Sequence, residues 1–398
     1  MKTVKLKTDD GRVHCPNCGE EVGTERIVEN TKGHCLRCQV WFLIELPIVK
    51  KKLVYIDQSL MSEFCQSDDR TEDGKLVRRI LDKLQQLKAQ QKVFLVVSDI
   101  HSAETAGFPS EHADQSKRLW KFQNNLADGH IAGNWCDVFI AQQRRRLAIP
   151  GTPEHFPSID IGIEDPHYWQ VGMKIMLANT WMGRLHQTGM SQPHRNEQHL
   201  AIIKKQVEAL GSNPKMHDTL SHIRGLWRKD MEGGIAAVRK TNELLQSEDR
   251  IRAIAGNSHI VLPTIPSSEF KIFVRQVIEG LNDGAALDEW QRQLDSNDCC
   301  AALRLRIAFE AEVLWSAVKG KPKNSDTGKF NVKYGVSRQN DIDHVAAFAP
   351  YVDVLTADDD MQNLCGRDMV KEELDQFPCQ LFSSKNYSQF EDWLDNLL

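Results

Sequence analysis

Short apolar runs alternate with amphipathic stretches in the first part of the chain that follows the N-terminal fifty residues. Leu53–Ile56 and Val93–Val97 are continuous apolar runs with the length of a buried strand. Between them, Gly74–Gln91 places leucine and isoleucine at helical spacing and lysine and arginine on the other face. Strand, helix, strand is the order of a βαβ unit, whose strands lie parallel. The pattern therefore predicts an α/β fold built on a parallel sheet.

The same alternation returns near the end of the chain. Asn340–Ala347 is predicted to be a helix with an acidic first turn, which suits the helix dipole. Val352–Thr356 and Gln380–Phe382 are predicted to be two more strands, and Tyr387–Leu398 a closing amphipathic helix. These elements continue the sheet that begins near residue 53.

The two α/β stretches are separated by residues 110–330, where several segments carry apolar residues three and four apart. We therefore predict an N-terminal segment in residues 1–50 and one α/β domain in two parts, residues 51–109 and 331–398. The mostly helical stretch is predicted to be either a large insertion into that domain or a separate helical domain.

Four cysteines stand in two CxxC pairs near the N-terminus, Cys15 with Cys18 and Cys35 with Cys38. This spacing predicts a zinc ribbon in which four thiolates hold one tetrahedral, structural Zn²⁺. About fifty residues bury little core, so the metal would supply folding energy. Two disulfides are the alternative, which a reducing compartment disfavours.

Composition narrows the class of protein. The chain has 398 residues, 41% hydrophobic and 26% charged, which is typical of a folded globular protein. No apolar run is long enough to span a bilayer, and the first residues lack the apolar core of a secretory signal. We therefore expect a cytoplasmic protein without a membrane partner. The net charge is -5, and residues 331–398 carry thirteen acidic side chains against five basic ones.

Some of these acids occupy positions where sites form in parallel sheets. Asp57 and Asp358 follow predicted strands, and Glu104 and Asp341 lie near the starts of helices. Each taken singly is a common cap or turn residue. If the fold brings the four carboxylates together, a divalent cation must offset their repulsion, and an all-oxygen site suits Mg²⁺ or Mn²⁺. Such metals catalyse phosphodiester hydrolysis.

Four segments in order resemble the PIN-domain family: Val54–Asp57, Ser98–Glu104, Asn340–His344 and Thr356–Asp359. The resemblance implies a three-layer α/β/α fold and a metal-dependent nuclease, usually a ribonuclease. It covers only residues 53–109 and 331–398, and the long stretch between the second and third segments departs from the family pattern.

The resemblance implies that four residues are the metal-binding acids, namely Asp57, Glu104, Asp341 and Asp358. Asp343 competes with Asp341, and Asp359 competes with Asp358. His344 is either a neighbour of the metal ligands or an ordinary buried histidine. The expected substrate is nucleic acid, RNA more than DNA, and the helical stretch or the ribbon could bind a protein partner.

Two other functions compete with the nuclease. In the first, the protein is an inactive PIN-like zinc-ribbon module that binds nucleic acid or protein. The second is an aspartate-nucleophile phosphatase, which needs another aspartate two positions after the first, where this chain has Ser59. The basic runs Lys50–Lys52 and Arg144–Arg146 could contact phosphates, but such runs are more often ordinary linker or packing residues.

Overall fold

The computed structural model describes these residues: 3–5, 13–22, 27–28, 32–45, 49–66, 70–106, 112–127, 131–163, 166–167, 192–211, 214–246, 269–319 and 336–398. The central element is a five-stranded sheet in which each neighbouring pair of strands is parallel. Its strands are β7 (Lys52–Tyr55), β8 (Val93–Ser98), β9 (Ile131–Ala132), β10 (Val354–Thr356) and β11 (Gln380–Phe382). The predicted α/β fold with a parallel sheet is confirmed.

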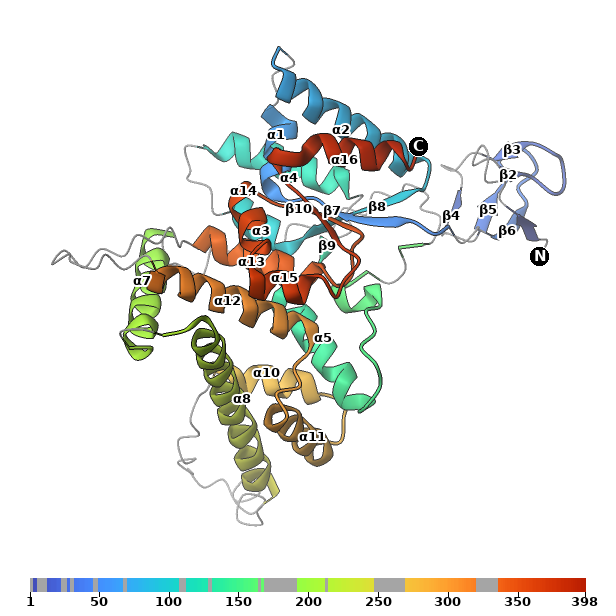
Figure 1. The fold of residues 1–398 in the computed structure, drawn as a ribbon. Coiled ribbons are helices and arrows are strands. Elements are labelled where there is room, and N and C mark those ends of the chain that lie inside the picture. Colours follow the sequence, from blue (N-terminus) through green and yellow to red (C-terminus); the bar gives the residue numbers. More distant parts are fainter. Residues whose placement is uncertain are drawn as a thin grey trace.

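The strand order across the sheet is β11-β10-β7-β8-β9 (Figure 1). The chain enters this sheet at β7, in the middle, and adds β8 and β9 on one side. It then returns to add β10 and β11 on the other side of β7. Residues far apart in sequence thus pair directly, with Val54 opposite Val354 and Tyr55 opposite Leu355. The neighbours β7 and β10 are where the strand order reverses, and ligands of open α/β sheets bind beyond the carboxyl ends of such strands.

One face of the sheet buries a layer of helices against Val54, Leu95 and Val354. The covering helices are α1 (Gln58–Gln66), α2 (Glu72–Ala89), α4 (Ala113–Leu126) and α16 (Tyr387–Asp395). The side chain of Thr71 caps α2 by accepting a hydrogen bond from the Gly74 backbone N–H. Figure 1 shows α2 and α16 lying together over the strands.

The opposite face packs Leu53, Tyr55 and Phe94 against a second helical layer. This layer includes α5 (Trp135–Ala148), α12 (Ala301–Lys319), α13 (Val336–Phe348), α14 (Asp359–Cys365) and α15 (Asp368–Leu374). Helices therefore cover both faces of the sheet.

The long stretch between β9 and α13 contributes further helices that continue this layer outward (Figure 1). They are α7 (Gln192–Ala209), α8 (Met216–Gln246), α10 (Glu269–Ile278) and α11 (Asp283–Asp295). Val238, Val274 and Leu287 belong to the same apolar cluster as Leu53 and Tyr55. The described helices of this stretch thus share one continuous core with the sheet.

The N-terminal residues form small β-structures around the cysteines. Their strands are β1 (Thr3–Lys5), β2 (Val13–His14), β3 (Glu21–Val22), β4 (Ile27–Val28), β5 (Lys32–His34) and β6 (Trp41–Glu45). The hairpin β2–β3 encloses the first CxxC pair, and the hairpin β5–β6 encloses the second. Gly33 is required in β5, because a Cβ atom there would lie 2.7 Å from the Phe42 ring.

One predicted detail of the C-terminal part is wrong. Helix α13 begins at Val336, so its first turn contains no acidic residue, and Asp341 and Asp343 lie in its second turn. The dipole of α13 therefore does not explain why acidic residues occupy positions 341 and 343. Their surroundings in the tertiary structure must do so.

Candidate metal centre and acidic site

Asp57 lies just beyond β7, between that strand and α1, and the residue is 7% exposed. Its backbone N–H donates to Thr356 Oγ1 at 2.8 Å, which ties it to the end of β10. Both the backbone N–H and the hydroxyl of Ser59 donate to Asp57 Oδ2. Burial raises the pKa of Asp57, but His344 and Ser59 outweigh burial, and the net effect is a lowered pKa. Asp57 is therefore held as a buried carboxylate.

Asp358 occupies the equivalent place beyond β10, as the N-cap of α14. Its Oδ1 accepts a hydrogen bond from the Met361 backbone N–H at 2.6 Å, and its side chain is exposed in part. Burial raises the pKa of Asp358, and the Asp57 carboxylate raises it further, against the Met361 hydrogen bond. The carboxylates of Asp57 and Asp358, at the ends of adjacent strands, thus repel each other.

Glu104 and Asp341 come from two helices, one that follows β8 in the chain and one that precedes β10. Glu104 lies on α3 (Asp99–Ala106), and its Oε1 accepts a hydrogen bond from Asn340 Nδ2 on α13 at 3.0 Å. That bond places Asp341, the next residue, close to Glu104. Burial raises the pKa of Glu104, and the Asp57 carboxylate adds to this.

Asp341 has the most strongly raised pKa of the four acids. Burial raises its pKa, and the carboxylates of Asp57, Glu104 and Asp358 raise it further, to about 8. Asp57, Glu104 and Asp358 thus each act on the charge of Asp341, although Asp57 is the only one of the four acids in the group of described side chains whose ligand atoms lie within 4.8 Å of one another.

The two alternative acids are engaged elsewhere. Asp343 forms an ion pair with Arg306 of α12 and accepts a hydrogen bond from Gln339 Nε2 at 3.2 Å. Asp359 accepts hydrogen bonds from the hydroxyls of Ser383 and Ser384 at 2.7 and 2.8 Å, and these lower its pKa. Both side chains thus have their own partners at the edges of the acidic site.

Two histidines lie beside Asp57, and the sequence predictions missed their joint role. His344 Nδ1 lies 3.6 Å from Asp57 Oδ1, and the His101 ring packs against the His344 ring with centroids 4.7 Å apart. Atoms of Asp57, His101 and His344 lie within 4.8 Å of one another and could hold a metal ion. Burial lowers the pKa of His101, whereas Asp57, Glu104 and Asp341 outweigh burial and raise the pKa of His344.

The four N-terminal cysteines also gather at one point and could hold a metal ion. Cys15 Sγ lies 3.5 Å from Cys38 Sγ, and Cys18 Sγ lies 3.6 Å from Cys35 Sγ, far beyond a disulfide bond length of about 2.05 Å. The two knuckles repeat the same backbone bonds, since Gly19 N–H donates to Cys15 O and Gln39 N–H donates to Cys35 O.

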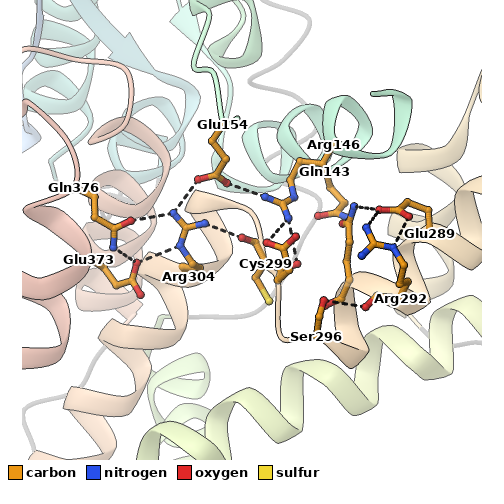
Figure 2. A network of polar contacts seen from close by, with 12 residues as sticks. Gln143, Arg146, Glu154, Glu289, Arg292, Ser296, Cys299, Arg304, Glu373 and Gln376 are labelled. Atoms are coloured by element: carbon orange, nitrogen blue, oxygen red, sulfur yellow. Dashed lines mark hydrogen bonds and ion pairs between the residues drawn. The ribbon is translucent and has the colours of Figure 1, made fainter. Parts of the chain in front are cut away.

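Most side chains of the two basic runs have partners within the protein. Arg144 donates to backbone carbonyls of α10, Arg145 pairs with Asp160, and Arg146 pairs with Glu154 and Asp298. Figure 2 shows Arg146 and Arg304 sharing Glu154 between α5 and α12. The contact with nucleic acid considered for Arg144–Arg146 stays a prediction, and these three side chains have partners within the protein. In the other run, Lys51 is buried, and Lys52 pairs with Asp353.

A small cavity lies between α8 and α12, and its lining includes Arg224, Trp227, Met231 and Ile307. None of the four acids borders this cavity. It is therefore separate from the acidic site.

No known protein family model matches this chain, and neither the curated proteins nor the solved structures contain a match. Among the helices of the described ranges, none combines the length and apolar character needed to cross a bilayer. The class of protein must therefore be inferred from the site itself.

Proposed function

We propose that the chain is a metal-dependent nuclease with a PIN-like domain, which hydrolyses phosphodiester bonds in RNA. The observation that supports this most is the placement of Asp57 and Asp358 after the paired strands β7 and β10, with the helices of Glu104 and Asp341 joined by the hydrogen bond from Asn340 to Glu104. Close carboxylates of this kind are unfavourable unless a cation neutralises them. Burial and this repulsion together raise the pKa of Asp341, and a bound divalent cation would neutralise the repulsion.

The four carboxylates offer oxygen ligands of the kind that Mg²⁺ and Mn²⁺ prefer. When bound, such an ion activates water and neutralises charge on the phosphate. Asp57 is oriented by Ser59 and by the backbone link to Thr356, so its carboxylate needs little reorganisation to bind an ion. Asp358 is the more exposed acid and would lie nearest to an approaching substrate.

We also propose that the four cysteines hold structural Zn²⁺. With Zn–S bonds of about 2.3 Å, tetrahedral geometry separates the sulfur atoms by about 3.8 Å. The two measured Sγ–Sγ distances, 3.5 and 3.6 Å, are close to this value. A site with four protein ligands is closed to substrate, so this ion would stabilise the small β-structures and take no part in hydrolysis.

The test is cleavage of single-stranded RNA and DNA by the full chain, with Mn²⁺ or Mg²⁺ added. Asp57→Asn should reduce cleavage by at least 100-fold, because it removes the best-ordered metal ligand. The matched control is Asp392→Asn, since Asp392 is exposed on α16, on the helical layer over the other face of the sheet. That variant should cleave as the unmodified protein does.

Equal cleavage by the two variants would trace the activity to a contaminant and refute the nuclease. Binding of RNA without metal-dependent cleavage would instead support the inactive binding module. Cleavage of DNA alone would keep the hydrolase and overturn the choice of RNA.

A further inference from the structure

The buried histidines beside Asp57 are unusual because three of their four ring nitrogens make no hydrogen bond to another described residue, although His344 Nδ1 lies at ion-pair distance, 3.6 Å, from Asp57 Oδ1. In the described part of the chain, His101 Nε2 and both ring nitrogens of His344 are buried without a hydrogen bond. The two residues are 0% and 2% exposed. Buried polar atoms are nearly always satisfied, so three such atoms at one place call for an unseen polar ligand.

The rings cannot be explained as simple apolar filling. His101 comes from α3 and His344 from α13, so two separate helices deliver imidazoles to the same carboxylate. Tyr55 and Phe348 stack nearby and exclude water from the rings. An unpartnered polar group in such surroundings costs about 1–3 kcal/mol, which apolar residues at both positions would avoid.

We propose that Asp57, His101 and His344 hold one transition-metal ion, so that the metal centre is a mixed nitrogen and oxygen site rather than an all-carboxylate one. Imidazole nitrogen suits transition metals such as Zn²⁺ and Fe²⁺, whereas Mg²⁺ and, for the most part, Mn²⁺ prefer oxygen. The donor atoms lie within 4.8 Å of one another. Ligands at about 2.1 Å from a shared ion lie about 3–4 Å apart, so binding needs only a small inward movement.

His101 must adopt a particular tautomer to take part. Its Nδ1 accepts a hydrogen bond from the Ser98 backbone N–H at 3.0 Å, an arrangement that puts the ring proton on Nε2. As a ligand through Nε2, the ring would carry its proton on Nδ1. It would then lose the hydrogen bond from the Ser98 N–H and would have to turn toward Ser98 Oγ, 3.4 Å away. Ser98 Oγ is itself 2.9 Å from Tyr55 Oη. His344 Nδ1 faces Asp57 at 3.6 Å and its Nε2 makes no hydrogen bond within the described ranges, so His344 is the stronger nitrogen ligand.

This inference refines the proposed nuclease, and its catalytic meaning depends on that function. The metal site itself is tested without any activity. Mn²⁺ is the probe, because thiolates favour softer ions and the cysteine cluster should keep its zinc. Electron spin echo spectra of Mn²⁺ bound to the full chain should contain modulation from directly coordinated ¹⁴N.

Variants that retain the size of the ring locate the nitrogen. His344→Gln should remove most of the ¹⁴N modulation and raise the Kd for Mn²⁺ about 10–100-fold, and His101→Gln should weaken both less. The matched control is His217→Gln, since the His217 side chain is 83% exposed on α8. That variant should leave the spectrum and the Kd unchanged.

Bound Mn²⁺ without ¹⁴N modulation in the unmodified protein would overturn the inference, even if His344→Gln failed to fold. An unchanged Kd in a folded His344→Gln protein would do the same. Modulation in a protein that cleaves no nucleic acid would uphold the metal site and refute only the nuclease. Cleavage with Mn²⁺ bound through oxygen alone would uphold the nuclease and refute this inference.

Discussion

Neutralising Asp341 should make the metal-free protein more stable, although it should impair metal binding. Burial and the carboxylates of Asp57, Glu104 and Asp358 raise the pKa of Asp341 from 3.8 to about 8. The folded protein therefore binds a proton more tightly than the unfolded chain does. Stability must fall as the pH rises from about 4 to 8, because folding then requires either uptake of a proton or a repelled charge.

The size of the effect follows from the same pKa. A pH of 7 lies about three units above the pKa of Asp341 in the unfolded chain. At about 1.4 kcal/mol per unit, the largest possible loss of folding free energy from this residue is therefore about 4 kcal/mol. Solvent and salt screen part of the repulsion. We therefore expect Asp341→Asn to raise the free energy of unfolding by about 1–3 kcal/mol at pH 7.5.

Urea denaturation at pH 7.5 and pH 5, in buffer without added divalent cations, measures the effect. The gain for Asp341→Asn should be largest at pH 7.5 and should shrink at pH 5. Added Mn²⁺ should reverse the order, because it stabilises the unmodified protein more than the variant. Asp392→Asn, at an exposed position, should change little at either pH. A variant that is less stable than the unmodified protein at pH 7.5 without metal would refute the idea of a repulsive acidic site.

Two further predictions concern the scaffold around the site. Arg79 and Lys83 of α2 form ion pairs with Glu391 of α16 and lower the pKa of that carboxyl to about 2. Glu391→Gln should therefore destabilise the protein at neutral pH. The loss of stability should shrink as the pH falls from about 4.5 toward 2, and urea denaturation at pH 7 and pH 3 can measure it. Gly234→Ala should lower the free energy of unfolding by about 1–3 kcal/mol, because its Cβ would lie 2.9 Å from Val274 Cγ2. Gly233 lies on the same helix but faces open space, so Gly233→Ala should raise the free energy of unfolding by about 0.5–1 kcal/mol in the same assay. Equal stabilities of the two alanine variants would contradict the packing of α8 on α10.

The strands β7, β8, β10 and β11 could be predicted from the sequence because they are local signals, whereas β9 (Ile131–Ala132) falls in residues 110–330 and was not predicted. Val93–Val97 and Gln380–Phe382 are apolar runs of strand length, and both are strands in the structure. The start of α13 was predicted too late, at Asn340 rather than Val336. The acids suggested a capped first turn, whereas the polar residues before them continue the helix.

The candidate site could be predicted only in part. Asp57 and Asp358 follow strands, so their meeting follows from the rule for parallel sheets. The pairing of His101 with His344 depends on how α3 and α13 cross, and a hydrophobic pattern indicates burial without indicating which side chains meet. The fate of Arg144, Arg145 and Arg146 was hidden for the same reason, because their carboxylate and carbonyl partners are distant in sequence.

The most direct test of the metal centre is an anomalous difference map from crystals grown with Mn²⁺, recorded at the manganese absorption edge. The account predicts a strong peak beyond the carboxyl ends of β7 and β10, within about 2.5 Å of an Asp57 carboxylate oxygen. Density for manganese only at other surfaces, with Asp57 and His344 still paired to each other alone, would contradict it.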